Sequence, residues 1–278
     1  IKEERNMRIE NSPRARLYEQ FNAAAFAGSS LGYPVIGSAQ DIESLELDDL
    51  AGWYKRWYAP NNATLIVVGD VDVADVVKQV EKHFGSIAAS RIEVAQDDEA
   101  RPATTLATEI EMYANTASPF LILGFVTPGF DRLDQVADAY ALDLLEGILD
   151  GGNSARFSRL LLRGDEAVAI AASASYDPFE PIQGLFILEG IPRKGVSLAR
   201  LQKELLAQID RLKREPVHAS ELDRVKAQVV AGRVYGQDSM FYGAMQIGMR
   251  DSAGLDWRLN NDYVENINQV SAKDIQRV

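Results

Sequence analysis

The residues best suited to chemistry come at the start of the chain. The opening, IKEERNMRIENSP, places two adjacent carboxylates, Glu3 and Glu4, before Arg5. Carboxylates bind zinc through oxygen or take a proton from an activated water. Taken alone, adjacent acidic residues in a helical pattern are typical of a solvated helix surface. No initiator methionine or capping residue precedes them, so we expect an excised piece of a longer protein.

Histidine and cysteine offer little else for metal or nucleophilic chemistry. The two histidines, His83 and His218, lie far apart in the sequence, and neither has another histidine three or four residues away. The chain therefore lacks the usual histidine pair of a zinc-binding helix, and we predict structural or exposed roles for both. The absence of cysteine excludes disulfides, thiolate catalysis and Cys-ligated zinc.

Two further candidates have structural explanations. Asp70 and Asp72, in VVGDVD, follow an apolar run and precede a helical pattern, so helix N-capping accounts for them better than catalysis. Gly151 and Gly152, in ILDGGNSARF, lack the glycine spacing and the lysine of a phosphate-binding loop. They predict a tight turn before a helix.

Composition narrows the class of protein. The 278 residues are 46% hydrophobic and 25% charged, which is typical of a folded globular protein. The net charge of −12 argues against nucleic acid as a partner, because phosphates bind to basic surfaces. No apolar run approaches the roughly 18 residues needed to cross a bilayer.

The first ninety residues predict an α/β layer. We expect helices over 1–28, 47–58 and 73–84, with the loop SSLGYPVIGS after the first of them. The run ATLIVVG is short, continuous and β-branched, which predicts a strand buried on both faces.

A second set of elements follows a polar stretch. Residues 86–104 are small, polar and acidic and include a proline, which predicts a linker over 91–104. Beyond it the pattern predicts two strands within 106–127, a helix over 131–149, a short helix, strands in AVAIAASASY and QGLFILEGI, and helices to the end, including about 196–214 and 219–235.

Three stretches of sequence resemble the M16 zinc peptidases, the family of pitrilysin, insulin-degrading enzyme and the mitochondrial processing peptidase. They are EERNMRIENSP, then YPVIGSAQDIESLELDDLAGWYKRWYAPNNATLIVVGDVD, then VEKHFGSI. The most specific part is PVIGS followed by a helix ending in WYAPNNATLIVVGDVD. The resemblance covers nearly the whole chain, and the second half resembles the later, non-metal-binding repeat of the family.

The resemblance implies an α+β fold of tandem M16-type domains, each an antiparallel-rich mixed sheet packed with helices, arranged as a clamshell around a chamber. Residues 1–90 would be the C-terminal part of the first, metal-binding domain. Residues 91–104 would be the linker, and 105–278 most of the second, non-metal-binding domain. We expect both termini to be truncated.

The family holds zinc with an inverted His-x-x-Glu-His motif and a glutamate on a later helix, and the motif glutamate acts as the general base. That motif is absent from this chain. No catalytic residue is therefore assigned here, and the general base is expected upstream of Ile1. The resemblance assigns the third zinc ligand to Glu4, with Glu3 as the alternative if the register differs by one.

Active members of the family also carry an arginine and, seven residues later, a tyrosine that hold the substrate carbonyl and the oxyanion. In SRLLLRGDEAVAIAASA, Arg163 stands for the arginine, which implies a substrate-binding role, and Ile170 occupies the place of the tyrosine. Isoleucine cannot donate a hydrogen bond. The departure implies either impaired catalysis or a partner subunit that supplies the pair in a heterodimer. The other interpretation of Arg163 is a surface arginine at a helix end.

Two functions stay open from the resemblance. The intact protein would be a zinc-dependent endopeptidase that cleaves peptides or unfolded proteins in a closed chamber. Alternatively, it would be a non-catalytic M16-like subunit that binds substrate or pairs with a catalytic chain. The 278-residue chain by itself is expected to bind no zinc tightly and to hydrolyse nothing. We expect a periplasmic or membrane-associated location directed by a missing N-terminus, with no membrane span and no nucleic-acid partner.

Overall fold

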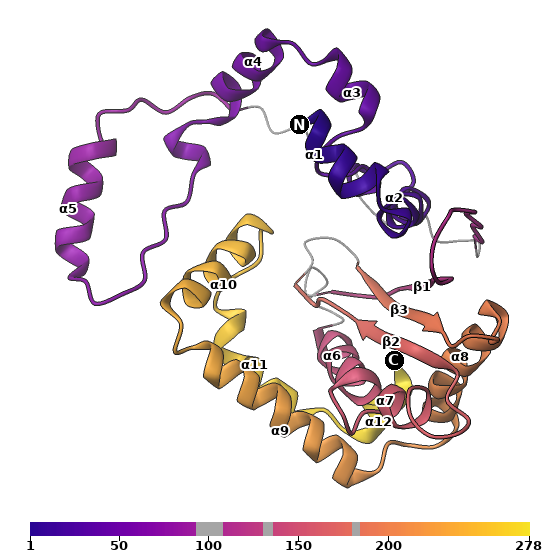
Figure 1. The fold of residues 1–278 in the computed structure, drawn as a ribbon. Helices are drawn as coiled ribbons and strands as arrows, with labels where there is room; N and C mark the ends of the chain where they lie inside the picture. Colours follow the sequence, from indigo (N-terminus) through magenta and orange to yellow (C-terminus); the bar gives the residue numbers. More distant parts are fainter. Residues whose placement is uncertain (93–107, 130–135, 180–183) are drawn as a thin grey trace.

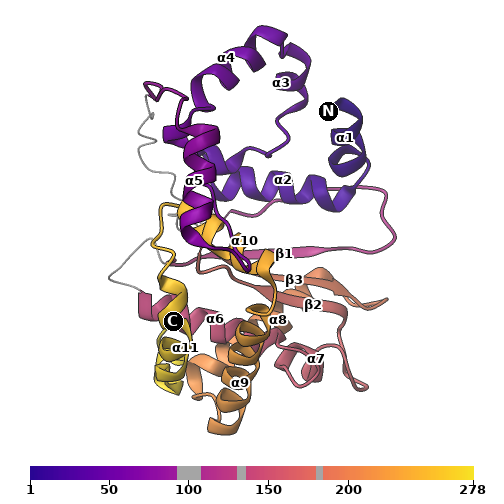
Figure 2. The same cartoon turned by 90° about the vertical axis from the view of Figure 1, so that its left-hand side faces the viewer.

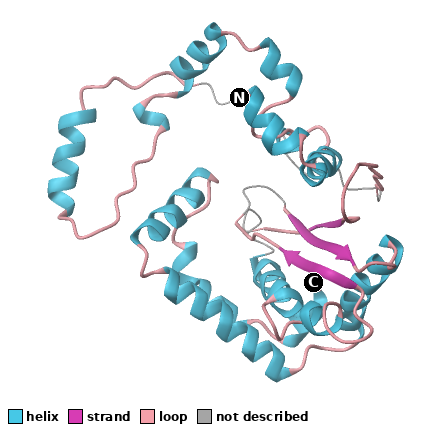
Figure 3. Cartoon of the chain, viewed as in Figure 1, coloured by secondary structure: helices cyan, strands magenta, loops and turns pink. Residues whose placement is uncertain are grey.

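A computed structural model describes residues 1–92, 108–129, 136–179 and 184–278 of the chain. The predicted linker, 91–104, and the beginning of the predicted helix 131–149 therefore lie largely outside the described residues. Helices dominate, and the strands that the structure describes lie in one small sheet in the second half (Figure 3). This is a mixed α+β fold, as the sequence predicts.

The first half consists of helices and extended connections (Figure 1). In chain order its elements are α1 (Lys2–Arg5), the π-helix η1 (Asn6–Glu10), α2 (Pro13–Ala25), the 3₁₀ turn η2 (Ser30–Gly32), α3 (Ala39–Ser44), α4 (Leu47–Trp57), the 3₁₀ turn η3 (Pro60–Asn62) and α5 (Val73–Phe84).

The second half surrounds the sheet with helices. Its elements are β1 (Leu121–Val126), α6 (Val136–Asp150), α7 (Arg156–Leu160), β2 (Ala169–Ser175), β3 (Leu185–Pro192), α8 (Leu198–Arg214), α9 (Ala219–Gly236), α10 (Met240–Ser252), α11 (Leu259–Gln269) and α12 (Ala272–Arg277). None of the helices in the described residues has the length and hydropathy needed to cross a bilayer.

β3 is the central strand of the sheet, which has the order β1-β3-β2 with both pairs antiparallel. Leu188 of β3 stands opposite Leu123 of β1 and opposite Ala174 of β2. Every second side chain of β3 is buried, because successive side chains of a strand point to opposite faces. The sheet therefore has one face against the core and one against the first half of the chain.

Helices cover both faces of the sheet (Figures 1 and 2). On one face lie α6, α7 and α8, with α9 packed against α6, and on the other lies α2. The α2 side is close-packed, since a Cβ added at Gly124 of β1 would lie 2.6 Å from the ring of Phe21. An ion pair joins the same layers, with Arg14 Nη2 of α2 lying 2.8 Å from Glu189 Oε2 of β3.

The hydrophobic core belongs to the second half of the chain. Its most buried helix is α6, where Leu144, Ile148 and Leu149 are fully buried. β3 approaches α8 closely, since a Cβ at Gly190 would lie 2.8 Å from a methyl carbon of Leu201. Every member of the buried cluster lies between Ala139 and Ile275.

The first half lacks a core of its own. Within residues 1–92 the buried side chains are Arg5, Ser29 and Ala59. The prediction of a strand in ATLIVVG, residues 63–69, is wrong: the segment is extended but unpaired, and Leu65 is 60% exposed. A strand buried on both faces needs hydrogen-bonded neighbours. The described part of the chain places no strand beside this segment, which lies against α5 and α10 instead.

Three smaller expectations need correction. The single helix predicted over 1–28 is divided, because Ser12 caps α2 and Pro13 opens it. Of the two strands predicted within 106–127, β1 forms, whereas residues 108–120 are not in a strand. The sequence SELD, residues 220–223, has the form of a capping box and predicts Ser220 as the cap of the helix over 219–235. The N-cap of α9 is instead His218, whose ring nitrogen accepts from the backbone N–H of Ser220.

Three carboxylates of α6 line one side of that helix at intervals of three and four residues: Asp143, Glu146 and Asp150. Burial raises the pKa of Asp143 to about 6, although the hydroxyl of Tyr263 donates to it. Burial, together with the charges of Asp143 and Asp150, raises the pKa of Glu146 to about 7. The folded state therefore holds these protons more tightly than the unfolded chain does.

We predict that Glu146→Gln stabilises the protein at pH 8 and not at pH 5. The pKa of Glu146 is higher in the folded state, so its contribution to stability is fully present below the ordinary value of 4.5 and is lost as the pH rises through about 7. An amide does not ionise, so the variant should gain about 1–2 kcal/mol at pH 8. Urea unfolding at both pH values measures the difference. The control Glu265→Gln, at an exposed position on α11, should show no such gain, and an unchanged pH dependence in Glu146→Gln would refute the assignment.

Candidate functional site

The predicted metal ligand lies on the first helix. Glu4 is on α1. Its Oε1 lies 3.0 Å from Nη2 of Arg8, four residues later, and the two side chains form an ion pair. The Glu4 side chain is 45% exposed, and Glu3 beside it is also exposed. A surface pair at this spacing contributes about 0.3–0.5 kcal/mol, so the carboxylate of Glu4 is accessible and weakly held.

Arg5 fixes the helix that carries these carboxylates. Its Nη2 lies 2.8 Å from Glu19 of α2, its Nε lies 3.1 Å from Glu10 of η1, and its Nη1 donates to the carbonyl of Gly37 at 2.8 Å. The guanidinium thus joins three segments, and the two carboxylates raise its pKa, Glu19 more than Glu10. Sequence reasoning missed this anchor, because its partners are 5, 14 and 32 residues away.

Arg5→Lys should loosen this anchor. A lysine keeps the positive charge but has a single nitrogen, so it replaces one of the three contacts. We expect a loss of about 1.5–3 kcal/mol in the local stability of α1 and α2, since hydrogen bonds to charged groups contribute on this scale. Hydrogen exchange of the α2 amides measures it.

The matched control for that variant is Arg8→Lys, an exposed arginine on the adjoining π-helix. It should leave exchange in α2 unchanged. Equal acceleration in both variants would show that Arg5 is not a specific anchor.

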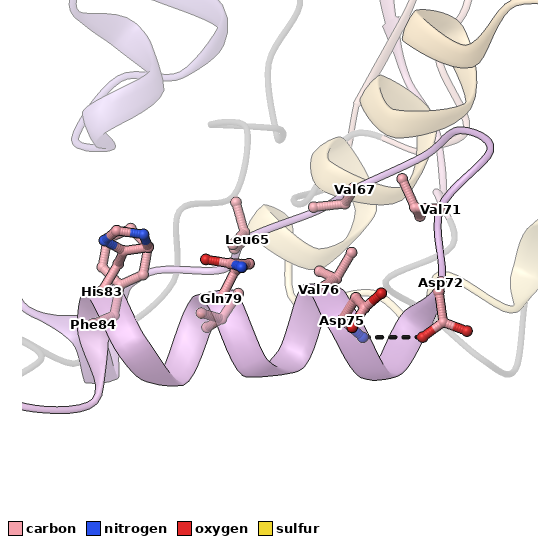
Figure 4. Close-up of a pocket in the computed structure, with 10 residues that line it drawn as sticks. Leu65, Val67, Val71, Asp72, Asp75, Val76, Gln79, His83 and Phe84 are labelled. Carbon is pink, nitrogen blue, oxygen red and sulfur yellow. Dashed lines mark hydrogen bonds between the residues drawn. The ribbon is translucent and has the colours of Figure 1, made fainter.

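A groove runs between the extended segment at 65–71 and α5 (Figure 4). Its volume is about 650 Å³, and its walls are mostly apolar, with Val67, Val76 and Phe84 among them. Asp72 caps α5 by accepting from the backbone N–H of Asp75 at 3.0 Å, which confirms the capping prediction for Asp72. In the close-up, this acidic end of the groove and His83 lie at opposite ends of α5.

The groove is not a metal centre. No group of three or more histidine, aspartate or glutamate side chains within the described ranges is arranged to hold a metal ion. Of the residues labelled in the close-up, Asp72 and Asp75 lie at the other end of α5 from His83 (Figure 4). A zinc site needs at least three protein ligands, so the described residues do not form one.

The predicted substrate-binding residue, Arg163, is exposed in the turn that follows α7. Its Nη2 donates to Asn153 Oδ1 at 2.6 Å. Ile170, at the place of the expected tyrosine, is on β2 and is 60% exposed. The glycine turn before α7 forms as predicted, with Gly152 at φ +86°.

The helix that carries Glu4, α1, and the helix that precedes Arg163, α7, lie on opposite sides of the sheet. α1 is on the side of α2, whereas α7 is on the side of α6 in both views (Figures 1 and 2). The described residues therefore do not bring the predicted zinc ligand and the predicted substrate arginine into one site.

Comparisons with known proteins agree with this architecture. The profile of a family described as the peptidase M16 inactive domain matches residues 44–229. The chain is 29% identical over 294 residues to the zinc protease PqqE of Helicobacter pylori, covering 100% of this chain and 62% of that protein. It is 24% identical over 277 residues to the beta subunit of the mitochondrial-processing peptidase of Lentinula edodes, covering 94% of this chain and 57% of that protein.

A solved structure has the same fold. The crystal structure of a protease from Helicobacter pylori superposes with a TM-score of 0.86 at 24% identity, over 99% of this chain and 65% of that one. The chain spans about 60% of the length of the two curated relatives described above.

Proposed function

This chain belongs to the M16 peptidase family, and on that premise we propose that it is part of a zinc-dependent endopeptidase. The observation that carries the proposal is the similarity of the whole chain to a relative named a zinc protease. The intact protein would hydrolyse peptide bonds in peptides or unfolded proteins. The present sequence has no His-x-x-Glu-His motif, so the proposed activity would use residues outside it.

Glu4 is the residue that we propose this chain contributes to the metal site. Its carboxylate is accessible, and Arg5 holds its helix against α2 and the loop at Gly37. Zinc, when bound, lowers the pKa of a water molecule towards neutrality. The role of Glu4 is to supply one oxygen ligand, and the histidine ligands and the general base would lie upstream of Ile1.

The test compares the intact protein with this chain. Metal analysis of the intact protein should find one zinc per molecule, and a fluorogenic peptide should be cleaved. The 278-residue chain should show neither. Stoichiometric zinc together with peptide cleavage by the 278-residue chain would overturn the assignment of the ligands. An intact protein that binds no zinc would overturn the proposal of a zinc-dependent endopeptidase.

One observation favours a second function. Ile170 takes the place of a hydrogen-bond donor and is exposed, so the chain lacks that donor on β2. A non-catalytic subunit that pairs with a catalytic chain would tolerate this change, and one relative is named as a subunit of a peptidase. If this function holds, the intact protein is inactive alone and active when mixed with its partner. We propose a periplasmic or membrane-associated location for either function, which cell fractionation tests.

A further inference from the structure

A polar cavity lies in the second half of the chain, apart from Glu4 and from Arg163. Its volume is about 270 Å³, and it is bounded by α6, α9, α10, α11 and the residues that follow β2. At roughly 30 Å³ per water molecule, this space holds a molecule of several heavy atoms. Its apolar lining includes Phe179, Val229 and Met249, and its polar lining includes Arg250 and Gln246.

Arg250 is the unusual member of this cavity. Arg250 is only 2% exposed, yet its buried Nε has no hydrogen-bond partner. Nη1 donates to the carbonyl of Gln246 at 2.9 Å, and the guanidinium lies over the ring of Phe179 at 3.5 Å. Burial and the charge of Arg233 lower the pKa of Arg250, whereas Asp177 is an opposite charge close enough to raise it. A buried guanidinium nitrogen without an acceptor is nevertheless costly in a low-dielectric site.

Further donors line the same space. The side-chain oxygen of Gln246 accepts from Arg233 Nη1 at 2.8 Å, which leaves the amide nitrogen of Gln246 as a donor. The hydroxyl of Tyr242 is a second neutral donor in the lining. Together with the guanidinium of Arg250, which lines the cavity, they form a donor set suited to an oxyanion.

The acidic residues of the cavity limit the charge of that anion. Asp143 accepts a hydrogen bond from Tyr263, and Asp177 accepts from the backbone N–H of Phe179 at 2.9 Å. Both carboxylates are engaged, and both face the cavity. A dianion such as phosphate would be repelled by them more strongly than a monoanion would.

We propose that this cavity binds a small carboxylate that carries an apolar group. The carboxylate accepts from the guanidinium of Arg250 and from Gln246, and its apolar group lies against Phe179, Val229 and Met249. A free carboxylic acid and the C-terminal end of a peptide share this chemistry. The site is independent of the zinc ligand, so it stands or falls separately from the proposed peptidase.

The test is a binding titration on the 278-residue chain with three probes: 4-methylpentanoate, N-acetyl-leucine and N-acetyl-leucinamide. Calorimetry measures the affinity, and the NMR signal of an arginine Nε–H reports the contact. Both acids should bind, whereas the amide should bind at least about tenfold more weakly, because it has no charge to offer Arg250. Binding of the first acid alone would assign the site to free acids rather than to peptide ends.

Two variants locate the binding. Arg250→Met should weaken the acids at least about tenfold, and Arg200→Met, at an exposed position on α8, should leave them unchanged. Circular dichroism checks that each variant folds, and the comparison of acid with amide needs no variant. Three results would overturn the proposal: equal affinity for acid and amide, binding of inorganic phosphate as tight as that of the acids or tighter, or no binding of either acid. The third result would show that the cavity holds only water.

Discussion

Glu4→Ala in the intact protein is expected to lower zinc affinity and peptide hydrolysis by at least about 100-fold. Substitution of residues that merely support a zinc ligand costs 10–100-fold, so loss of a ligand itself should cost no less. The fold should survive, because Glu4 is 45% exposed and its ion pair is with exposed Arg8. Metal analysis after dialysis and peptidase rates measure the two effects.

Glu3→Ala is the matched control for that variant. The two glutamates are adjacent and on the same short helix, and each substitution removes one negative charge. Activity should fall with Glu4→Ala and stay close to the wild-type rate with Glu3→Ala. The reverse result would move the ligand by one residue, and two active variants would remove both glutamates from the metal site.

Hydrogen exchange should differ by at least about 1,000-fold between the two halves of the 278-residue chain. Amides of α6 and β3 exchange through opening of a packed core, in which Leu144 and Leu188 are fully buried. The helices α4 and α5 contain no buried residue. Their hydrogen bonds should therefore open at little cost, and mass spectrometry of exchanged peptides measures the contrast.

Leu144→Ala provides the internal control for the exchange experiment. It should lower the stability of the second half by about 2–5 kcal/mol and accelerate exchange in α6. Exchange in α5 should not change, because no residue of α5 belongs to the buried cluster. Similar protection in α5 and α6 of the original chain would show that the first half has a stable core after all.

The sequence predicts the second half well because its signals are local. Helical periodicity over 196–214 and 219–235 corresponds to α8 and α9 to within two residues. The alternating run QGLFILEGI becomes β3, with alternate side chains buried. Each of these elements can bury its apolar face against the neighbours that this chain supplies.

The first half shows where such reasoning stops. ATLIVVG has the composition of a buried strand, but pairing depends on neighbours that a single segment does not specify. In the structure its half-buried member is Ile66, and a Cβ added at Gly248 of α10 would lie 3.1 Å from it. Composition therefore predicts what a segment can become, and the surrounding layers decide whether it does.

The candidate sites were predictable to different degrees. Glu4 and Arg163 come from a family resemblance, and they stay predictions. The anchor at Arg5 and the cavity at Arg250 each depend on contacts between separate elements. In the sequence, Arg250 is one arginine in an ordinary helical pattern, so nothing local marks it as buried.

The π-helix η1 constrains how the chain length can vary near Glu4. A π-turn behaves as a one-residue insertion in an α-helix, and η1 begins immediately after α1. Deleting one residue from Asn6–Glu10 would restore regular α-helical hydrogen bonds, but it would rotate α1 by about 100° relative to the residues that follow. Glu4 and Arg5 would turn together, away from Glu19 and Gly37. Homologues with a carboxylate at the position of Glu4 should therefore tolerate substitutions within η1 far more readily than insertions or deletions there.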